Sequence, residues 1–272
     1  MHTGKSYKLS EFLKWTRRDI YVLIVLGVVP VVAYQIGNIK WLGTPSTVVA
    51  LLGTATAFVV GFKNLQTYNR TWEARQIWGD IISSSRAWGT MSRDFLDNAE
   101  KSTELVYRHL AWLTALRYQL RENRAWETIN KAYNAEYLKY YSIPEMQTAL
   151  ETELAKYLPD AERKQILAAR GKATQIMSLQ SKTIKGLFTS KAIDVPQFLD
   201  MQRSIKDFLL QQGRCECIKD FPYPRQYATI NSFFTKLFCL LLPFGLLKEF
   251  DALNDSVYGL IKGHMVWLVI PF

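Results

Sequence analysis

The segment that most constrains this chain is residues 41–62, WLGTPSTVVALLGTATAFVVGF, which carries no charge over twenty-two positions. At about 1.5 Å of rise per residue, a helix of this length can cross the hydrocarbon core of a bilayer. Half of its residues are nevertheless Gly, Ala, Ser or Thr, whereas a helix that only faces lipid is richer in Leu, Ile and Phe. Such small and hydroxyl-bearing residues favour close packing against other helices or the lining of a polar cavity.

Positions four apart share one face of a helix, so this segment has two adjacent ridges. The first ridge consists of the small residues Gly53, Ala57 and Gly61, and the second consists of Thr54, Phe58 and Phe62. The small ridge lets neighbouring helices approach, and we expect it to serve helix packing. The second ridge presents a hydroxyl above two aromatic rings, as the wall of a pore would. A membrane helix packed inside its own bundle explains this segment equally well, and the segment alone leaves both interpretations open.

A second uncharged run, residues 20–39, precedes the first, and only Lys40 separates the two. The two runs therefore predict a membrane hairpin with a very short external turn. Because a second span follows the first at once, we expect the first to be a membrane span rather than a cleaved signal peptide. Basic residues flank both ends of the hairpin: Lys5, Lys8, Lys14, Arg17 and Arg18 before it, and Lys63, Arg70 and Arg75 after it. Both ends, including the N-terminus, are therefore expected in the cytoplasm.

Two further apolar stretches lie near the other end of the chain. Residues 227–247 carry one charge, at Lys236, and predict a third span. The stretch 264–272 has nine residues, which is too short to cross about 30 Å of hydrocarbon. We expect a fourth span that is truncated here, with residues 248–263 as an external loop.

The roughly 160 residues between the two apolar pairs are polar, which brings the mean hydropathy of the whole chain to −0.06. They read as helical almost throughout, without alternating strand patterns. The predicted organisation is all-α, with an N-terminal arm and first hairpin at 1–62, a cytoplasmic helical region at 63–226, and a second hairpin at 227–272.

Local signals divide the middle region into helices. Residues 63–96 continue the second span without a break, and a 3.6-residue period places Leu105, Trp112, Leu116 and Leu120 on one buried face. Helices are expected to begin near Pro144, Pro159 and Pro196, because proline is favoured in a first turn. A continuous amphipathic helix is predicted over 166–187, and Gly213 is predicted to end the helix that begins near Pro196.

The net charge of +10 does not by itself indicate a nucleic-acid partner, because Lys and Arg are spread along the chain. The three histidines, His2, His109 and His264, are far apart and show no metal-ligand spacing, and His109 is expected to be a surface or packing residue. Cys215 and Cys217 form a CxC pair that is expected to stay reduced. No catalytic or phosphate-binding motif is present. We therefore expect no enzyme activity, no cofactor, no metal site and no nucleic-acid partner.

Two groups of motifs carry a resemblance to a known family. The segment FVVGFKNLQTYNRTWEARQIWGD at 58–80 resembles the second helix of the bestrophins, in which Gly-Phe is followed eight residues later by Arg-x-Trp. The segment CECIKDFPYPRQY at 215–227, followed by LPFGL at 242–246, resembles the bacterial branch, where Arg is expected at Cys217 and Thr at Phe221. The resemblance covers essentially the whole chain and keeps the order of its elements.

This resemblance implies a homopentameric ion channel in a bacterial inner membrane, with monovalent ions and membrane lipid as its other partners. In bestrophins the second helix of each subunit lines a hydrophobic neck, which here falls on Thr54, Phe58 and Phe62. A cytoplasmic constriction near an I-x-x-P sequence corresponds to Ile193 to Gln197, with Ile184 as a further candidate. In the animal members a calcium-binding acidic cluster lies beyond the fourth span, and we expect no calcium site on the residues of this chain. The sign of the ion stays open, and the alternative is a membrane-anchored helical scaffold or sensor that binds a cytoplasmic protein.

Overall fold

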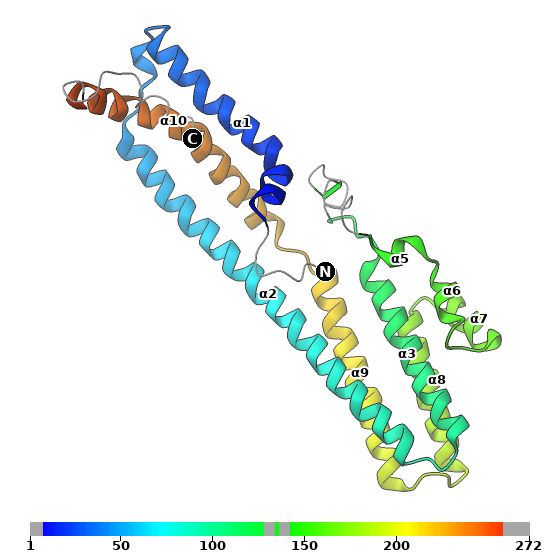
Figure 1. Ribbon diagram of the computed structural model, residues 1–272. Helices are drawn as coiled ribbons and strands as arrows, with labels where there is room; N and C mark the ends of the chain where they lie inside the picture. Colours follow the sequence, from blue (N-terminus) through cyan, green and yellow to red (C-terminus); the bar gives the residue numbers. More distant parts are fainter. Residues whose placement is uncertain (1–7, 128–133, 136–141, 258–272) are drawn as a thin grey trace. The chain divides into compact units, whose positions relative to one another are not determined.

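The computed structural model describes residues 8–127, 134–135 and 142–257, and every regular element within these ranges is helical. The elements are α1 (Leu9–Gln35), the short 3₁₀ helix η1 (Lys40–Leu42), α2 (Ser46–Asp94), α3 (Ala99–Arg121), α5 (Pro144–Gln147), α6 (Leu150–Leu154), α7 (Asp160–Ala168), α8 (Lys172–Thr189), α9 (Val195–Asp220) and α10 (Arg225–Val257) (Figure 1). The predicted all-α class is confirmed.

The chain divides into two compact units. The first contains α1, η1, α10 and the part of α2 up to Tyr68, and the second contains α2 from Asn69 onward together with α3 and α5 to α9. Within the described residues, three helical stretches are long and apolar enough to cross a membrane: Leu9–Gln35, Lys40–Asp94 and Arg225–Ala252. The predicted fourth span at 264–272 lies outside the described residues.

In the first unit, α10 holds the turn between the first two spans. Lys40, the single charge between those spans, lies 3.3 Å from the Asp251 carboxylate, which also accepts a 2.9 Å hydrogen bond from the Tyr34 hydroxyl. The Ser46 hydroxyl donates to Glu249 over 2.7 Å. These bonds satisfy the polar groups of Tyr34, Lys40 and Ser46, which lie next to apolar spans and would be costly to leave without partners.

The same contacts correct one prediction. Residues 248–263 were expected to form an external loop, but α10 continues as a helix to Val257. No glycine or proline interrupts residues 248–257. From these turns Glu249 accepts from the Ser46 hydroxyl and Asp251 pairs with Lys40, so this end of α10 is bonded to residues more than 200 positions earlier in the chain.

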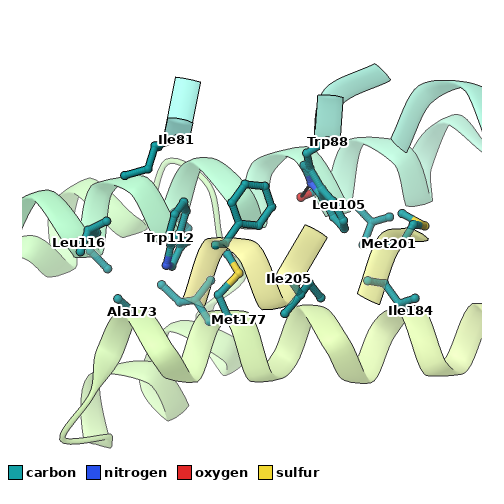
Figure 2. Packing of buried hydrophobic residues seen from close by; sticks show 14 of the residues in the cluster. Ile81, Trp88, Leu105, Trp112, Leu116, Ala173, Met177, Ile184, Met201 and Ile205 are labelled. Carbon is teal, nitrogen blue, oxygen red and sulfur yellow. Dashed lines mark hydrogen bonds between the residues drawn. The ribbon is translucent and has the colours of Figure 1, made fainter. Parts of the chain in front are cut away.

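The second unit is built around α3, whose predicted face is buried. Leu105, Trp112 and Leu116 have no exposed surface, as expected (Figure 2). Leu120 is partly buried against the same core. The buried indole N–H of Trp112 donates to Gln212 over 2.9 Å. That bond satisfies a polar group that would otherwise be costly in the core.

The expected helix starts near Pro144, Pro159 and Pro196 are present, but two predicted boundaries are wrong. The helix expected over 166–187 is broken, because α7 ends at Ala168 and α8 begins at Lys172 after Gly171. Gly213 does not stop α9, which continues to Asp220. A glycine inside a helix costs about 1 kcal/mol, and here the neighbouring Gln212 is buried and hydrogen-bonded to Trp112 and Thr174, which ties this turn of α9 to α3 and α8.

A buried arginine joins α7 to α3. Arg108 is 2 % exposed, and its guanidinium donates to the two Glu162 oxygens over 2.6 and 3.2 Å. It also donates to Glu104 over 2.7 Å and to Thr183 over 2.9 Å. A buried charge is tolerated only when it is paired in this way, so these bonds fix the position of α7.

His109 is buried among aromatic rings, which settles its predicted role as packing. Its ring lies 4.6 Å from that of Phe208 and 5.3 Å from that of Trp112, measured between centroids. Its Nε2 lies 2.9 Å from the Ser85 hydroxyl, while its buried Nδ1 has no hydrogen-bond partner. Burial lowers the pKa of His109 from 6.5 to about 4, because this site cannot solvate an imidazolium.

This burial predicts a pH-dependent stability. Between pH 6.5 and about 4 the unfolded chain protonates His109 and the folded chain does not, so the free energy of unfolding falls as the pH is lowered, by up to about 3 kcal/mol. His109→Gln removes the titrating group and should reduce this fall. The measurement is the unfolding midpoint of purified protein in detergent at pH 7, 5.5 and 4.5. Parallel pH profiles for the two proteins would contradict the assignment.

Candidate functional site

The second ridge of α2 is uncovered in this chain. Thr54 is exposed, and Phe58 and Phe62 are 65 and 67 % exposed. The Thr54 hydroxyl donates to the Ala50 carbonyl over 3.0 Å, so its proton is satisfied within the helix and its oxygen remains an acceptor. The ridge thus presents an acceptor oxygen and two aromatic rings to whatever surrounds the chain.

α10 covers the opposite side of this helix. Val49 and Thr56 are buried, and a Cβ added at Gly245 of α10 would come within 2.7 Å of Val49. With 3.6 residues per turn, Val49 and Thr56 point away from the Thr54–Phe58 ridge. The two faces of α2 are therefore distinct, with one packed within the chain and the other left free.

The small ridge is divided between these two environments. Gly53 belongs to the packed side, because a Cβ there would lie 2.8 Å from the Phe238 ring. Ala57 and Gly61 are exposed, and a Cβ at Gly61 would meet nothing within 4 Å. Among the helices that the structure describes, α10 therefore packs on the first member of the ridge and leaves the other two exposed.

The structure extends the aromatic ridge by two residues that the spacing-of-four analysis missed. Leu51 and Leu65 are 73 and 54 % exposed and lie on the same face, because Leu51 precedes Thr54 by three positions and Leu65 follows Phe62 by three. A search for the combined i, i+3, i+4 pattern would have found them. The uncovered apolar face runs from Leu51 to Leu65.

Two of the residues predicted for the cytoplasmic constriction are enclosed within this chain. Ile184 has no exposed surface and Ile193 is 4 % exposed, because both lie in the core of the second unit (Figure 2 shows Ile184). A side chain enclosed by its own core has no surface to present to a pore. Gln197 is half-buried and closes a capping box with Asp194, and its side-chain oxygen accepts from the Asp194 N–H over 2.9 Å. The exposed apolar side chain in this segment is Val195.

The two motif segments meet in the second unit. Arg70, from the 58–80 segment, donates a hydrogen bond to the carbonyl of Ile218, from the 215–227 segment. The next residue, Lys219, pairs with Glu127. Arg70 on α2 and Ile218 near the end of α9 are about 150 positions apart in the chain, and the sequence spacing alone did not indicate that they would be in contact.

The part of the chain that the structure describes holds no group of three or more His, Cys, Asp or Glu residues placed to bind a metal ion. Its cysteines, Cys215, Cys217 and Cys239, are all free thiols, and burial raises the pKa of Cys215. These groups show no arrangement for nucleophilic or redox chemistry.

The architecture and motifs agree with a comparison against known families. A sequence model described as Bacterial/Fungal Bestrophin protein matches residues 12–262, which is nearly the whole chain. The chain belongs to the bacterial and fungal bestrophin family. The family resemblance drawn from the motifs is confirmed.

Individual relatives share about a quarter of their aligned residues with this bestrophin. It is 26 % identical over 220 residues to a voltage-dependent anion channel-forming protein of Ralstonia nicotianae, a match that covers 78 % of this chain and 63 % of the relative. It is 24 % identical over 213 residues to the voltage-dependent anion channel-forming protein YneE of Escherichia coli K12, covering 78 and 62 %. The chain thus spans under two thirds of the length of these relatives, which are named for channel formation rather than for catalysis.

A solved structure shares the fold of this bestrophin. A variant of a bacterial bestrophin homologue from Klebsiella pneumoniae superposes with a TM-score of 0.73 at 22 % identity, covering 95 % of this chain and 83 % of that one. A further structure of the same homologue gives a TM-score of 0.72 over 93 and 85 %. The bestrophin fold therefore holds for the chain, and with it the description as a membrane protein with several apolar helices.

The divided faces of α2 predict opposite outcomes for one substitution at two glycines. Gly245→Ala should lower the unfolding temperature, because the new methyl group overlaps β-branched Val49 and such overpacking costs about 1–3 kcal/mol. Gly79→Ala, on the face of α2 that carries Gly61 but beyond the small ridge, should leave it unchanged or raise it, since a Cβ there would meet nothing within 4 Å and helix propensity improves by about 1 kcal/mol. Thermal unfolding of both variants in detergent measures the difference, and equal losses would contradict the assignment of faces.

Proposed function

We propose that this chain is one subunit of an anion channel in which α2 of each copy lines a narrow apolar neck. The observation that carries the proposal is the uncovered face of α2, where Thr54, Phe58 and Phe62 point away from the side that α10 covers. The relatives' printed names, which specify the formation of anion channels, support the same function. Small monovalent anions are the proposed permeant ions.

The proposed assembly is a homopentamer around a central axis. Ala57 and Gly61, which the chain itself leaves uncovered, supply a surface on which a neighbouring copy packs closely. Five copies then place five Phe58 and five Phe62 rings around the neck. A constriction of this kind conducts when wetted and closes by dewetting.

The second constriction of the proposed pore lies on the cytoplasmic side, at the N-terminal end of α9. Val195 is the residue we propose for it, because it is 54 % exposed while Ile184 and Ile193 are enclosed in the core. Gln197 stays beside it through the capping box with Asp194.

The proposed location is a bacterial inner membrane, with the N-terminus and residues 63–226 in the cytoplasm. The basic residues that flank the first hairpin support this orientation. The turn that contains Lys40 then lies outside, together with the end of α10 that holds it. Four spans per subunit complete the proposed topology.

The neck predicts a gain of flux on truncation. Replacing both Phe58 and Phe62 with Ala removes two rings of large apolar side chains and should raise single-channel conductance in a planar bilayer. Phe233→Ala is the matched control, because Phe233 is similarly exposed but lies on α10. Unchanged conductance in the double variant would place these rings against lipid or a neighbouring helix. If folded wild-type oligomers give no current in the bilayer, the alternative function of a membrane-anchored scaffold or sensor would be favoured.

The small ridge predicts a defect in assembly without a defect in folding. Ala57→Leu adds bulk where only a neighbouring copy is proposed to approach, so the oligomer should dissociate into smaller species. Light scattering of detergent-solubilised protein measures the mass, and circular dichroism checks that helix content is retained. An intact pentamer with Leu at this position would remove the packing role.

A further inference from the structure

A pocket of about 320 Å³ lies in the second unit, where the chain after α3 meets α2 and the end of α9. Its polar members are Arg70, Glu127 and Lys219, and its walls include the rings of Trp78 and Trp126. The volume suits a small organic molecule or one part of a larger one. The proposed ion pathway uses none of these side chains.

The charges in this pocket do not cancel. Lys219 and Glu127 form an ion pair, and their side chains are only 15 and 26 % exposed. Arg70 donates to the Ile218 carbonyl, which satisfies one N–H but neutralises no charge. A guanidinium has five N–H donors, so Arg70 retains donors for an acceptor of opposite charge. The lining therefore carries one net positive charge.

The rest of the lining is mostly apolar. Ala74, Ile77, Leu120 and Pro222 supply aliphatic surface, and Trp78 and Trp126 are 39 and 37 % exposed. Partly open indole rings beside an uncompensated guanidinium offer both apolar contact and an anion partner. A ligand that contacts the indole rings and also pairs with the guanidinium has one anionic group and an apolar body.

We propose that this pocket binds an amphipathic organic anion, whose carboxylate or phosphate meets Arg70 and whose apolar body packs on Trp78 and Trp126. Both a membrane lipid and a soluble aromatic acid carry this chemistry. Arg70 and Pro222 stand beside two of the points at which the chain passes between the units, after Tyr68 and before Tyr223. An occupant of the pocket would therefore bind α2 and α9 together next to these crossings.

The test is calorimetric titration of the full chain in detergent with 2-naphthoate and with 2-naphthalenemethanol, which has the same rings and no charge. Naphthoate should bind at one site per chain, at least about tenfold more tightly than the alcohol, because only the carboxylate offers Arg70 an acceptor of opposite charge. Equal affinities for the two probes, or no saturable binding of naphthoate, would overturn the proposal.

Variants locate the site. Arg70→Gln should weaken naphthoate binding at least about tenfold, whereas Arg214→Gln should not. Arg214 is a matched control because it lies on α9, pairs with Asp80 and does not line the pocket. Trp126→Leu tests the apolar wall and should also weaken binding, so the site stays testable if Arg70→Gln fails to fold. Equal weakening by Arg214→Gln would reduce the effect to net charge and overturn the assignment.

Titration in lipid nanodiscs distinguishes a membrane lipid from a soluble aromatic acid as the ligand of this pocket. Weaker naphthoate binding in phosphatidylglycerol discs than in phosphatidylcholine discs would assign the site to the headgroup of an anionic lipid. Equal affinity in both would assign it to a soluble anion. Absence of binding in both discs overturns the proposal. These readouts need no ion current, so they are independent of the channel proposal.

Discussion

The constraint on which the rest of this structure depends is the continuity of α2, which runs for 49 residues. In hydrocarbon every backbone N–H and C=O must be bonded within the segment, which a helix achieves without partners. The same helix then supplies Ile77, Ile81 and Trp88 to the core of the second unit. One uninterrupted backbone therefore links a segment that needs an apolar surrounding to a segment that builds a conventional core.

The cover that the chain provides for this helix is small. Only 11 % of the most apolar window of α2 is buried inside the chain, compared with 17 % for α1 and 22 % for α10. Exposed apolar side chains in such number are unfavourable in water, so lipid or other copies of the chain must cover them. The contact with α10 at Val49 and Gly53 fixes which side remains for those neighbours. The proposed neck is what remains on the uncovered side.

Features set by local pattern could be predicted from the sequence, and features set by distant contacts could not. The hairpin, the continuation of α2 and the buried face of α3 follow from hydropathy and a 3.6-residue period. The break before Lys172 and the passage of α9 through Gly213 depend on packing between helices. The extension of α10 to Val257 is accompanied by the bonds of Glu249 and Asp251 to the turn. The burial of Ile184 and Ile193 likewise depends on tertiary packing, because the sequence pattern around an isoleucine does not distinguish a side chain in a core from one that faces a pore.

The geometry of α2 also constrains how the proposed channel would select its ion. The uncovered face from Leu51 to Leu65 carries no charge. Lys63 and Arg70 follow it in sequence, but at 100° per residue both fall on the opposite side of the helix from Thr54 and Phe58. Arg70 is moreover bonded to the Ile218 carbonyl. Neither base can therefore supply the preference for anions from within the neck. In such a pore the neck controls passage through its width and wetting, and the charge that discriminates between ions must lie on other residues.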